Sequence, residues 1–251
     1  MGRVEFDFNP SVPIFDANVA LGRRHDRPVR VDSVAGTLDA MKRAGVSRAV
    51  VHSPHAANFD GGEGHSVLLD SVRGYPSLVP QFVCNPSFDD LGAFSSQVGE
   101  VGVTSVRMFP VLHKYPFQDW IVRPYLEWLA AEKLPLWIAA DECDPAVVYD
   151  TFSKHSDLRV VLCEVHYKHL VWAVPMLKSL ANLNIEISRL SATDAVSEAI
   201  EALGTARVLY GSRFPDHPMS PQLYHLHRCD LSDAQLQEVC SGNLERLLNL
   251  Q

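Results

Sequence analysis

Residues 135–166, PLWIAADECDPAVVYDTFSKHSDLRVVLCEVH, contain two short apolar runs that flank a stretch with helical character. The runs, Pro135–Glu142 and Arg159–His166, are rich in Val, Leu, Ile and Trp, and polar residues follow at their carboxyl ends. Near-continuous apolar runs of this kind are typical of parallel strands that are covered on both faces. The segment therefore predicts a strand, a helix over residues 145–155 and a second strand parallel to the first.

The same alternation continues on both sides of this segment. Further strands are predicted at Pro13–Leu21, Arg48–Ser53, Leu78–Asn85, Thr104–Pro110, Asn184–Leu190 and Arg207–Pro215. Further helices are predicted over residues 31–45, 88–102, 120–134, 171–183, 194–204 and 231–250. Eight strands alternating with helices in 251 residues favour one α/β domain, residues 1–251, folded as a closed (β/α)8 TIM barrel. A doubly wound open sheet is the alternative, but the sequence lacks GxGxxG after its first strand.

The composition argues against one class of partner and indicates the cellular compartment. The formal net charge of −8 argues against a nucleic-acid partner, which would need a basic face. The five cysteines are widely spaced without a CxxC pair, so reduced thiols in a cytoplasmic protein are expected. No apolar run is long enough for a membrane span, and the amino terminus lacks the pattern of a signal peptide. Soluble barrels often form dimers, so a homodimer is one expectation.

Four passages resemble the amidohydrolase-related family, in the branch that includes aminocarboxymuconate semialdehyde decarboxylase, resorcylate decarboxylase and small lactonases. PIFDANVALG (residues 13–22) resembles the opening strand, where the family has an Asp followed by His-x-His, and PLWIAADE resembles the fifth strand. RVLYGSRFPDHP (residues 207–218) resembles the eighth strand, where the family reads Gly-Ser-Asp-Tyr/Phe-Pro. LSDAQLQEVCSGNLERLLNL (residues 231–250) resembles the closing helix. The resemblance implies a barrel whose site lies at the carboxyl ends of the strands.

The resemblance also implies a metal site, but the residues at its positions differ from the family's ligands. The family holds its metal with His-x-His, a His on strand five or six, and an Asp on strand eight. The matching positions here are Asn18 and Ala20, Ala139, Glu164 and Arg213. Ala offers no ligand, and Arg places a permanent cation where the metal would lie. We therefore expect no metal and no cofactor. A zinc hydrolase with displaced ligands, such as the loose cluster His52, His55 and His65, is the least favoured alternative.

Two of these changes compensate each other in charge. Arg213 is positive where the family has Asp, and Glu164 is negative where it has His, so an ion pair across the mouth is expected. We expect Arg213 to bind a substrate carboxylate or to stabilise developing negative charge. The alternative is a salt bridge that fills a dead site. His166 shares a face with Glu164 if the strand continues, which makes both candidates for general acid or base catalysis; a hydrogen-bonded loop histidine is the alternative.

Five further strand-end residues are candidates for substrate binding. They are Asn18, Arg107, Asp141, Glu186 and His217. Arg107 matches a Lys or Arg that the family often has and is a candidate anion site, while Asn18 would orient the substrate. Each of these residues also has a structural interpretation as a satisfied polar group. Cys163 is expected to be a buried thiol that faces the surrounding helices.

Two functions from different classes remain open. The first is a metal-independent hydrolase or lyase, catalysing lactone or amide hydrolysis or decarboxylation, with an anionic small-molecule substrate that carries a carboxylate. The second is a catalytically inactive barrel that serves as a binding or scaffold protein. The fold cannot choose between them, because one fold supports many functions. A mouth that is filled by its own side chains would favour the second.

Overall fold

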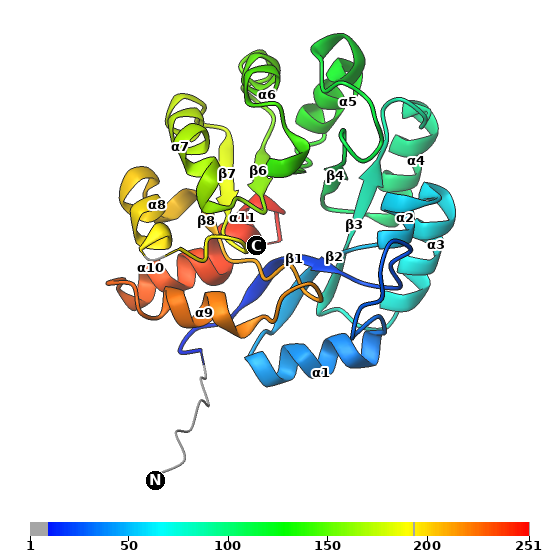
Figure 1. Ribbon diagram of the computed structural model, residues 1–251. Helices are drawn as coiled ribbons and strands as arrows, with labels where there is room; N and C mark the ends of the chain where they lie inside the picture. The colour runs from blue at the N-terminus through cyan, green and yellow to red at the C-terminus, as the bar shows by residue number, and fades with distance from the viewer. Residues whose placement is uncertain (1–9, 193, 251) are drawn as a thin grey trace.

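The computed structural model describes residues 10–192 and 194–250, and it forms a ring of eight strands surrounded by helices (Figure 1). The strands are β1 Phe15–Ala20, β2 Arg48–His52, β3 Leu78–Cys84, β4 Val106–Met108, β5 Leu136–Ala139, β6 Val160–Cys163, β7 Leu183–Glu186 and β8 Val208–Leu209. Neighbours in sequence pair in parallel from β1 to β8. The predicted (β/α)8 barrel is confirmed.

The barrel closes between β1 and β8 through backbone hydrogen bonds and through the side chain of Asp16. The backbone N–H of Ala17 donates to the carbonyl of Tyr210 at 3.0 Å. Beyond this bond, Asp16 Oδ1 accepts the backbone N–H groups of Asn18 and Ser212, both at 3.0 Å. In a regular sheet, a backbone carbonyl would accept these N–H groups. Here the Asp16 side chain accepts them and so links the segment of β1 to the segment that follows β8.

The helices cover the outside of the barrel. They are α1 Val34–Ala44, α2 Pro54–Asn58, α3 Gly61–Val72, α4 Leu91–Val101, α5 Asp119–Ala131, α6 Pro145–Phe152, α7 Leu170–Ser179, α8 Ala195–Leu203, α9 Ser220–Leu226, α10 Asp233–Gln237 and α11 Asn243–Leu247. Between α10 and α11 a π-helical turn, Glu238–Gly242, interrupts the predicted closing helix. None of the described helices is both long and apolar enough to cross a lipid bilayer.

Helices α2 and α3, which connect β2 and β3, were not predicted from the sequence, and neither was α9. The segment contains Gly61, Gly62 and Gly64, and glycine is a poor helix former. A Cβ atom on Gly64 would lie 2.3 Å from the backbone nitrogen of Ala56. Glycine at this position therefore allows α3 to pack directly against α2.

Apolar side chains fill the inside of the barrel as well as the space under the helices. The inner cluster comprises Phe15, Ala17, Val50, Val79, Trp137, Ala139, Val161, Cys163 and Leu209, together with Leu244, Leu247 and Leu248 of the carboxyl-terminal segment. Glu245 and Asn249 bind Arg48 and Arg159, which lie at the amino ends of β2 and β6. The carboxyl-terminal segment therefore closes the barrel at that end, and α11 is seen inside the ring of strands (Figure 1). Cys163 is buried as expected, but it faces this interior, so its predicted orientation was wrong.

Candidate functional site

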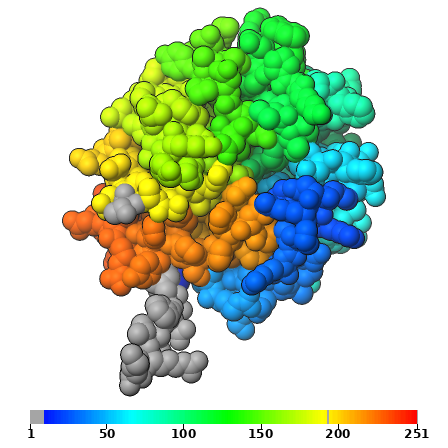
Figure 2. Space-filling view, viewed as in Figure 1, coloured from blue at the N-terminus to red at the C-terminus, as the bar shows by residue number. Residues whose placement is uncertain are grey.

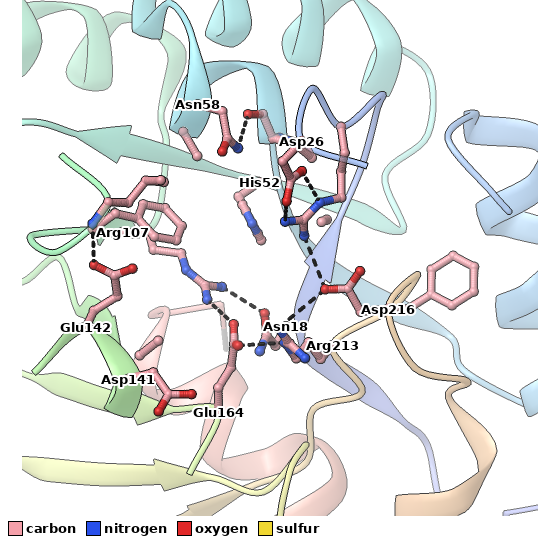
Figure 3. A pocket seen from close by; sticks show the side chains of 18 residues that line it. Asn18, Asp26, His52, Asn58, Arg107, Asp141, Glu142, Glu164, Arg213 and Asp216 are labelled. Carbon is pink, nitrogen blue, oxygen red and sulfur yellow. Dashed lines mark hydrogen bonds and ion pairs between the residues drawn. The ribbon is translucent and has the colours of Figure 1, made fainter. Parts of the chain in front are cut away.

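A cavity of about 320 Å³ opens at the opposite end of the barrel, where the strands reach their carboxyl ends. Charged side chains from well-separated strands line it (Figure 3): Arg107 comes from β4, Glu164 follows β6, and Arg213 follows β8. The aromatic ring of Phe109 and the aliphatic side chain of Leu112 contribute apolar surface. The cavity therefore lies where (β/α)8 barrels carry their functional residues.

Glu164 lies between two guanidinium groups. Its Oε1 accepts a hydrogen bond from Arg107 Nη2 at 2.6 Å, and its Oε2 is 2.6 Å from Arg213 Nε. Arg107 is only 1% exposed, so this ion pair is largely removed from water. Burial raises the pKa of Glu164, but the two arginines outweigh burial and hold the pKa below its usual value. The predicted pair of Arg213 and Glu164 is confirmed, and Arg107 is a second partner of the same carboxylate.

Both members of the predicted pair have left-handed backbones. The φ angle is 57° at Glu164 and 59° at Arg213, a region that costs a non-glycine residue about 1–3 kcal/mol. Hydrogen bonds hold each backbone in place: the N–H of Glu164 donates to Glu186 Oε2 at 3.0 Å, and the N–H of Arg213 donates to the carbonyl of Asn18 at 2.8 Å. The strained backbones of Glu164 and Arg213 thus direct both side chains into the cavity.

Glu186 lies beneath the cavity and does not line it. Its carboxylate accepts hydrogen bonds from Asn18 Nδ2 and Ser188 Oγ, both at 3.0 Å, in addition to the N–H of Glu164. Asn18 Oδ1 in turn accepts from Arg107 Nη1 at 2.8 Å. Burial raises the pKa of Glu186, although these bonds oppose the rise. The structure therefore gives Glu186 a positioning role behind Asn18 and Glu164 in place of the substrate contact expected from the sequence.

Replacing Gly211 by Ala is expected to lower the free energy of unfolding by about 1–3 kcal/mol, the usual cost of overpacking. A Cβ at this position would lie 2.3 Å from Glu186 Oε1. Glu186 cannot retreat without breaking its bonds to Asn18 and Glu164. Urea denaturation measures the change. Gly99→Ala is the control: Gly99 lies within α4 with nothing near its Cβ, so about 0.5–1 kcal/mol of stabilisation is expected. A Gly211→Ala protein as stable as the wild type would contradict the positioning role.

His166 does not share a face with Glu164, because the strand does not continue as expected. β6 ends at Cys163, and His166 precedes a single 3-10 turn, Tyr167–His169, whose Lys168 N–H donates to its Nδ1 at 3.5 Å. It is not among the residues that line the cavity. The structure therefore separates the two proposed acid–base residues and brings only Glu164 to the cavity.

Asp141 and His217 lie at the rim of the site. Asp141 lines the cavity and is bound by Arg189 and by Lys168 Nζ, the latter at 3.1 Å. Burial raises the pKa of Asp141, but the bonds from Arg189 and Lys168 outweigh burial and lower the pKa to about 2. His217 is exposed, and its Nε2 lies 3.4 Å from Arg213 Nη1. Asp141 is thus an ionised wall residue, whereas His217 contacts the site only through Arg213.

His52 lines the cavity, although its sequence position does not separate it from the neighbouring histidines. It ends β2 and is 9% exposed. Burial, followed by the charges of Arg107 and Arg24, lowers its pKa well below 6.5. The imidazole is therefore neutral at neutral pH. A neutral imidazole has one donor nitrogen and one acceptor nitrogen. The place of His52 at a strand end was the only available signal.

The other two histidines of the loose cluster point elsewhere. His65 is buried, stacks on Phe82 with ring centroids 4.0 Å apart, and accepts the N–H of Val83 at 3.0 Å. His55 Nδ1 lies 2.9 Å from His25 Nε2 near the surface. Within residues 10–192 and 194–250, no three His, Cys, Asp or Glu side chains are grouped so that they can hold a metal ion.

Two residues that the resemblance matches to the family's metal ligands, Asn18 and Glu164, are bound to guanidinium groups, which does not fit a divalent cation. Asn18 Oδ1 is bound by Arg107, and both oxygens of Glu164 are bound by guanidinium groups. An added metal ion would meet the charges of Arg107 and Arg213, and like charges a few ångströms apart repel strongly in a partly buried site. Arg107 and Arg213 therefore take the place at which a metal ion would bind Asn18 and Glu164.

Fold and site together define a TIM-barrel protein with a charged cavity at the carboxyl ends of its strands. Residues 9–250 match the amidohydrolase family, and the chain belongs to that family. No curated protein sequence matches the chain.

Solved structures with the same fold include three that cover nearly all of the chain. An uncharacterized TIM-barrel protein from Bordetella bronchiseptica has a TM-score of 0.77 at 13% identity, covering 95% of this chain and 99% of its own. The 5-carboxyvanillate decarboxylase of Sphingomonas paucimobilis has a TM-score of 0.75 at 15% identity, with the same coverage. A dihydroxybenzoic acid decarboxylase from Polaromonas sp. JS666 was solved with manganese and the inhibitor 2-nitroresorcinol. It has a TM-score of 0.74 at 13% identity, covering 95% of this chain and 97% of its own. Identities this low establish the shared fold alone.

Proposed function

We propose that this barrel is a metal-independent hydrolase or carbon–carbon lyase that acts on a small carboxylate-bearing substrate. The observation that carries the proposal is the pair of guanidinium groups, Arg107 and Arg213, bound to Glu164 at the cavity wall. A permanent cation in a partly buried site can bind a carboxylate and stabilise negative charge that develops on it. Arg213 would then provide the positive charge that a metal provides elsewhere in the family.

Two carboxylates of the cavity, Glu164 and Asp141, favour lyase chemistry over hydrolysis. Hydrolysis without a metal needs a general base for water, and a base works best when its pKa is near the working pH. Glu164 and Asp141 both have lowered pKa values because arginines bind them. They are therefore poor bases and act as counter-ions that orient Arg213 and Arg189. Decarboxylation of a bound acid requires less: the bond to the carboxylate breaks, carbon dioxide leaves with the electron pair of that bond remaining on carbon, and that carbon takes a proton from water, which leaves hydroxide. Two of the similar structures are decarboxylases.

The remaining polar groups would orient the substrate. The neutral His52 ring can exchange a hydrogen bond with a hydroxyl group or a water molecule. The Asn18 side chain donates to Glu186 through its amide nitrogen and accepts from Arg107 at its amide oxygen, so its role is to fix those two groups. Phe109 lies under the guanidinium of Arg107 at 5.0 Å and supplies a flat apolar wall. A panel of small carboxylic acids, assayed for carbon dioxide release with a chelator present, tests the proposal.

Replacing Arg213 by Gln is expected to weaken binding of a small carboxylate such as benzoate by roughly 10–100-fold, the effect of losing a charge-assisted hydrogen bond. The variant should fold, because Glu164 keeps its bond to Arg107. Calorimetric titration of benzoate in the presence of a chelator measures the affinity. Arg43→Gln, which removes an exposed arginine of α1, is the control. Unchanged benzoate affinity in Arg213→Gln would rule out the proposed role of this arginine.

A second candidate function is a non-catalytic carboxylate binder. It is favoured by the observation that Arg24, Arg107 and Arg213 are each already paired with an internal carboxylate. Binding of benzoate without turnover of any acid in the panel would support this candidate and exclude the lyase.

A further inference from the structure

Three arginines converge on a single oxygen atom at the mouth of the cavity. Asp216 Oδ2 lies 2.6 Å from Arg27 Nη2, 3.2 Å from Arg24 Nη1 and 3.5 Å from Arg213 Nη2. The side chain of Asp216 is 9% exposed. Figure 3 shows Asp216 beside Arg213, and Figure 2 shows the blue segment after β1 against the orange segment after β8 on this face.

This arrangement contains more positive charge than Asp216 alone can satisfy. Arg24 has Asp26 as a further partner, and Arg213 has Glu164. Within the described part of the chain, Arg27 has no other ion pair than the one with Asp216. Guanidinium groups bind carboxylates best through two parallel bonds to two oxygens, and here three of them share one oxygen. An incoming oxyanion would offer additional acceptors to the same three arginines.

The three arginines stand between two hollows of the surface. Arg24, Arg213 and Asp216 line the main cavity of about 320 Å³. Arg24 and Arg27 also line a second hollow of about 520 Å³, which is formed by the segment that follows β1. A ligand in the main cavity therefore lies beside Asp216, Arg24 and Arg213.

We propose that Asp216 is an internal counter-ion that occupies a carboxylate-binding site formed by Arg24, Arg27 and Arg213, and that a ligand carboxylate displaces it. The inference rests on the proposed function in one respect, namely that the ligand is a carboxylate. It adds a competition inside the chain: Asp216 holds the segment after β1 to the segment after β8 until the ligand replaces it. Asp216 then lowers affinity for every carboxylate and gives Arg27 an ion-pair partner in the empty barrel.

Formate, the smallest carboxylate, is the probe for this site. Removing the internal competitor by Asp216→Asn is expected to tighten formate binding by roughly tenfold, because one charge-assisted partner no longer has to be displaced. The affinity is obtained by fitting the rise in melting temperature with formate concentration c, because the stabilisation follows RT ln(1 + c/Kd). Asp26→Asn is the matched control, because Asp26 also pairs with Arg24 but its side chain is 46% exposed. The affinity of the Asp26→Asn protein for formate should stay within about twofold of the wild type. Equal or weaker binding by Asp216→Asn would overturn the proposal.

The same experiment remains decisive if Asp216→Asn is unstable. Formate should then raise its melting temperature more than it raises that of the wild type, because the anion restores the missing counter-charge; equal shifts would overturn the proposal. Arg27→Gln in the Asp216→Asn background should abolish the gain, since Arg27 contacts Asp216 directly. Persistence of the gain would also overturn it. Failure of this site is distinct from failure of the proposed function, which is read from carbon dioxide release.

Discussion

Replacing Glu164 by Gln is expected to lower the free energy of unfolding by about 3–5 kcal/mol, the range for breaking a buried ion pair from one side. Arg107 is 1% exposed and would lose its only ionised partner among the described residues, while Arg213 would lose its closest one. An uncompensated buried guanidinium is costly because water cannot solvate it. The effect should be visible as a melting temperature lower by roughly 6–20 °C, given the usual relation for a chain of this size.

The control for this variant is a surface pair. Asp70→Asn removes the partner of Arg73, but both side chains are more than two-thirds exposed, so the change should stay within about 0.5 kcal/mol. Urea denaturation at neutral pH compares the two variants. A loss below about 1 kcal/mol for Glu164→Gln would show that Arg107 finds other compensation. The interpretation of this cluster as an interdependent ion-pair network would then be wrong.

Replacing Asp16 by Asn is expected to stabilise the protein above neutral pH, by as much as about 4 kcal/mol. Burial raises the pKa of Asp16 from 3.8 to about 7, against the opposing hydrogen bonds from Ser212 and Asn18. Its Oδ2 has no hydrogen-bond partner among the described residues. Ionisation of this carboxyl therefore penalises the folded state. The amide oxygen of Asn can still accept the two backbone N–H groups, and Asn carries no charge.

The sign of the pH dependence follows from proton binding. Above pH 3.8 the unfolded chain loses the Asp16 proton, whereas the folded chain keeps it until about pH 7. The folded state binds more protons in this window, so its stability falls as the pH rises. Asp16→Asn should thus match the wild type near about pH 4 and exceed it increasingly up to about pH 8. Urea denaturation across this range measures the difference. A constant difference, or one that shrinks with rising pH, would disprove the raised pKa.

The fold was readable from the sequence because parallel strands buried on both faces leave a local signature. All eight apolar runs became strands, although each is shorter than predicted; the last, β8, keeps only Val208 and Leu209. The failures have local causes. Helix α3 was missed because Gly64 serves the packing against α2 instead of helix propensity. β6 was predicted too long because Val165 continues the apolar pattern, while the left-handed backbone of Glu164 leaves no trace in it.

The site was only partly readable, because distance in space is not a sequence property. The opposite charges of Glu164 and Arg213 predicted a pair, and that pair is present. Arg24 and Arg27 were not singled out, since they precede Asp216 by about 190 residues and lie in a segment without periodicity. The closure of the barrel between β1 and β8 brings them together. Glu186 was placed at a strand end correctly, but its complete burial depends on Gly211, a contact that no spacing reveals.

Elemental analysis of the protein, purified from cells supplied with zinc and manganese, tests most directly whether arginine has replaced the metal. We expect no stoichiometric transition metal, and benzoate affinity that a chelator leaves unchanged. One zinc or manganese ion per chain, retained through dialysis and removed by the chelator together with benzoate binding, would contradict this expectation.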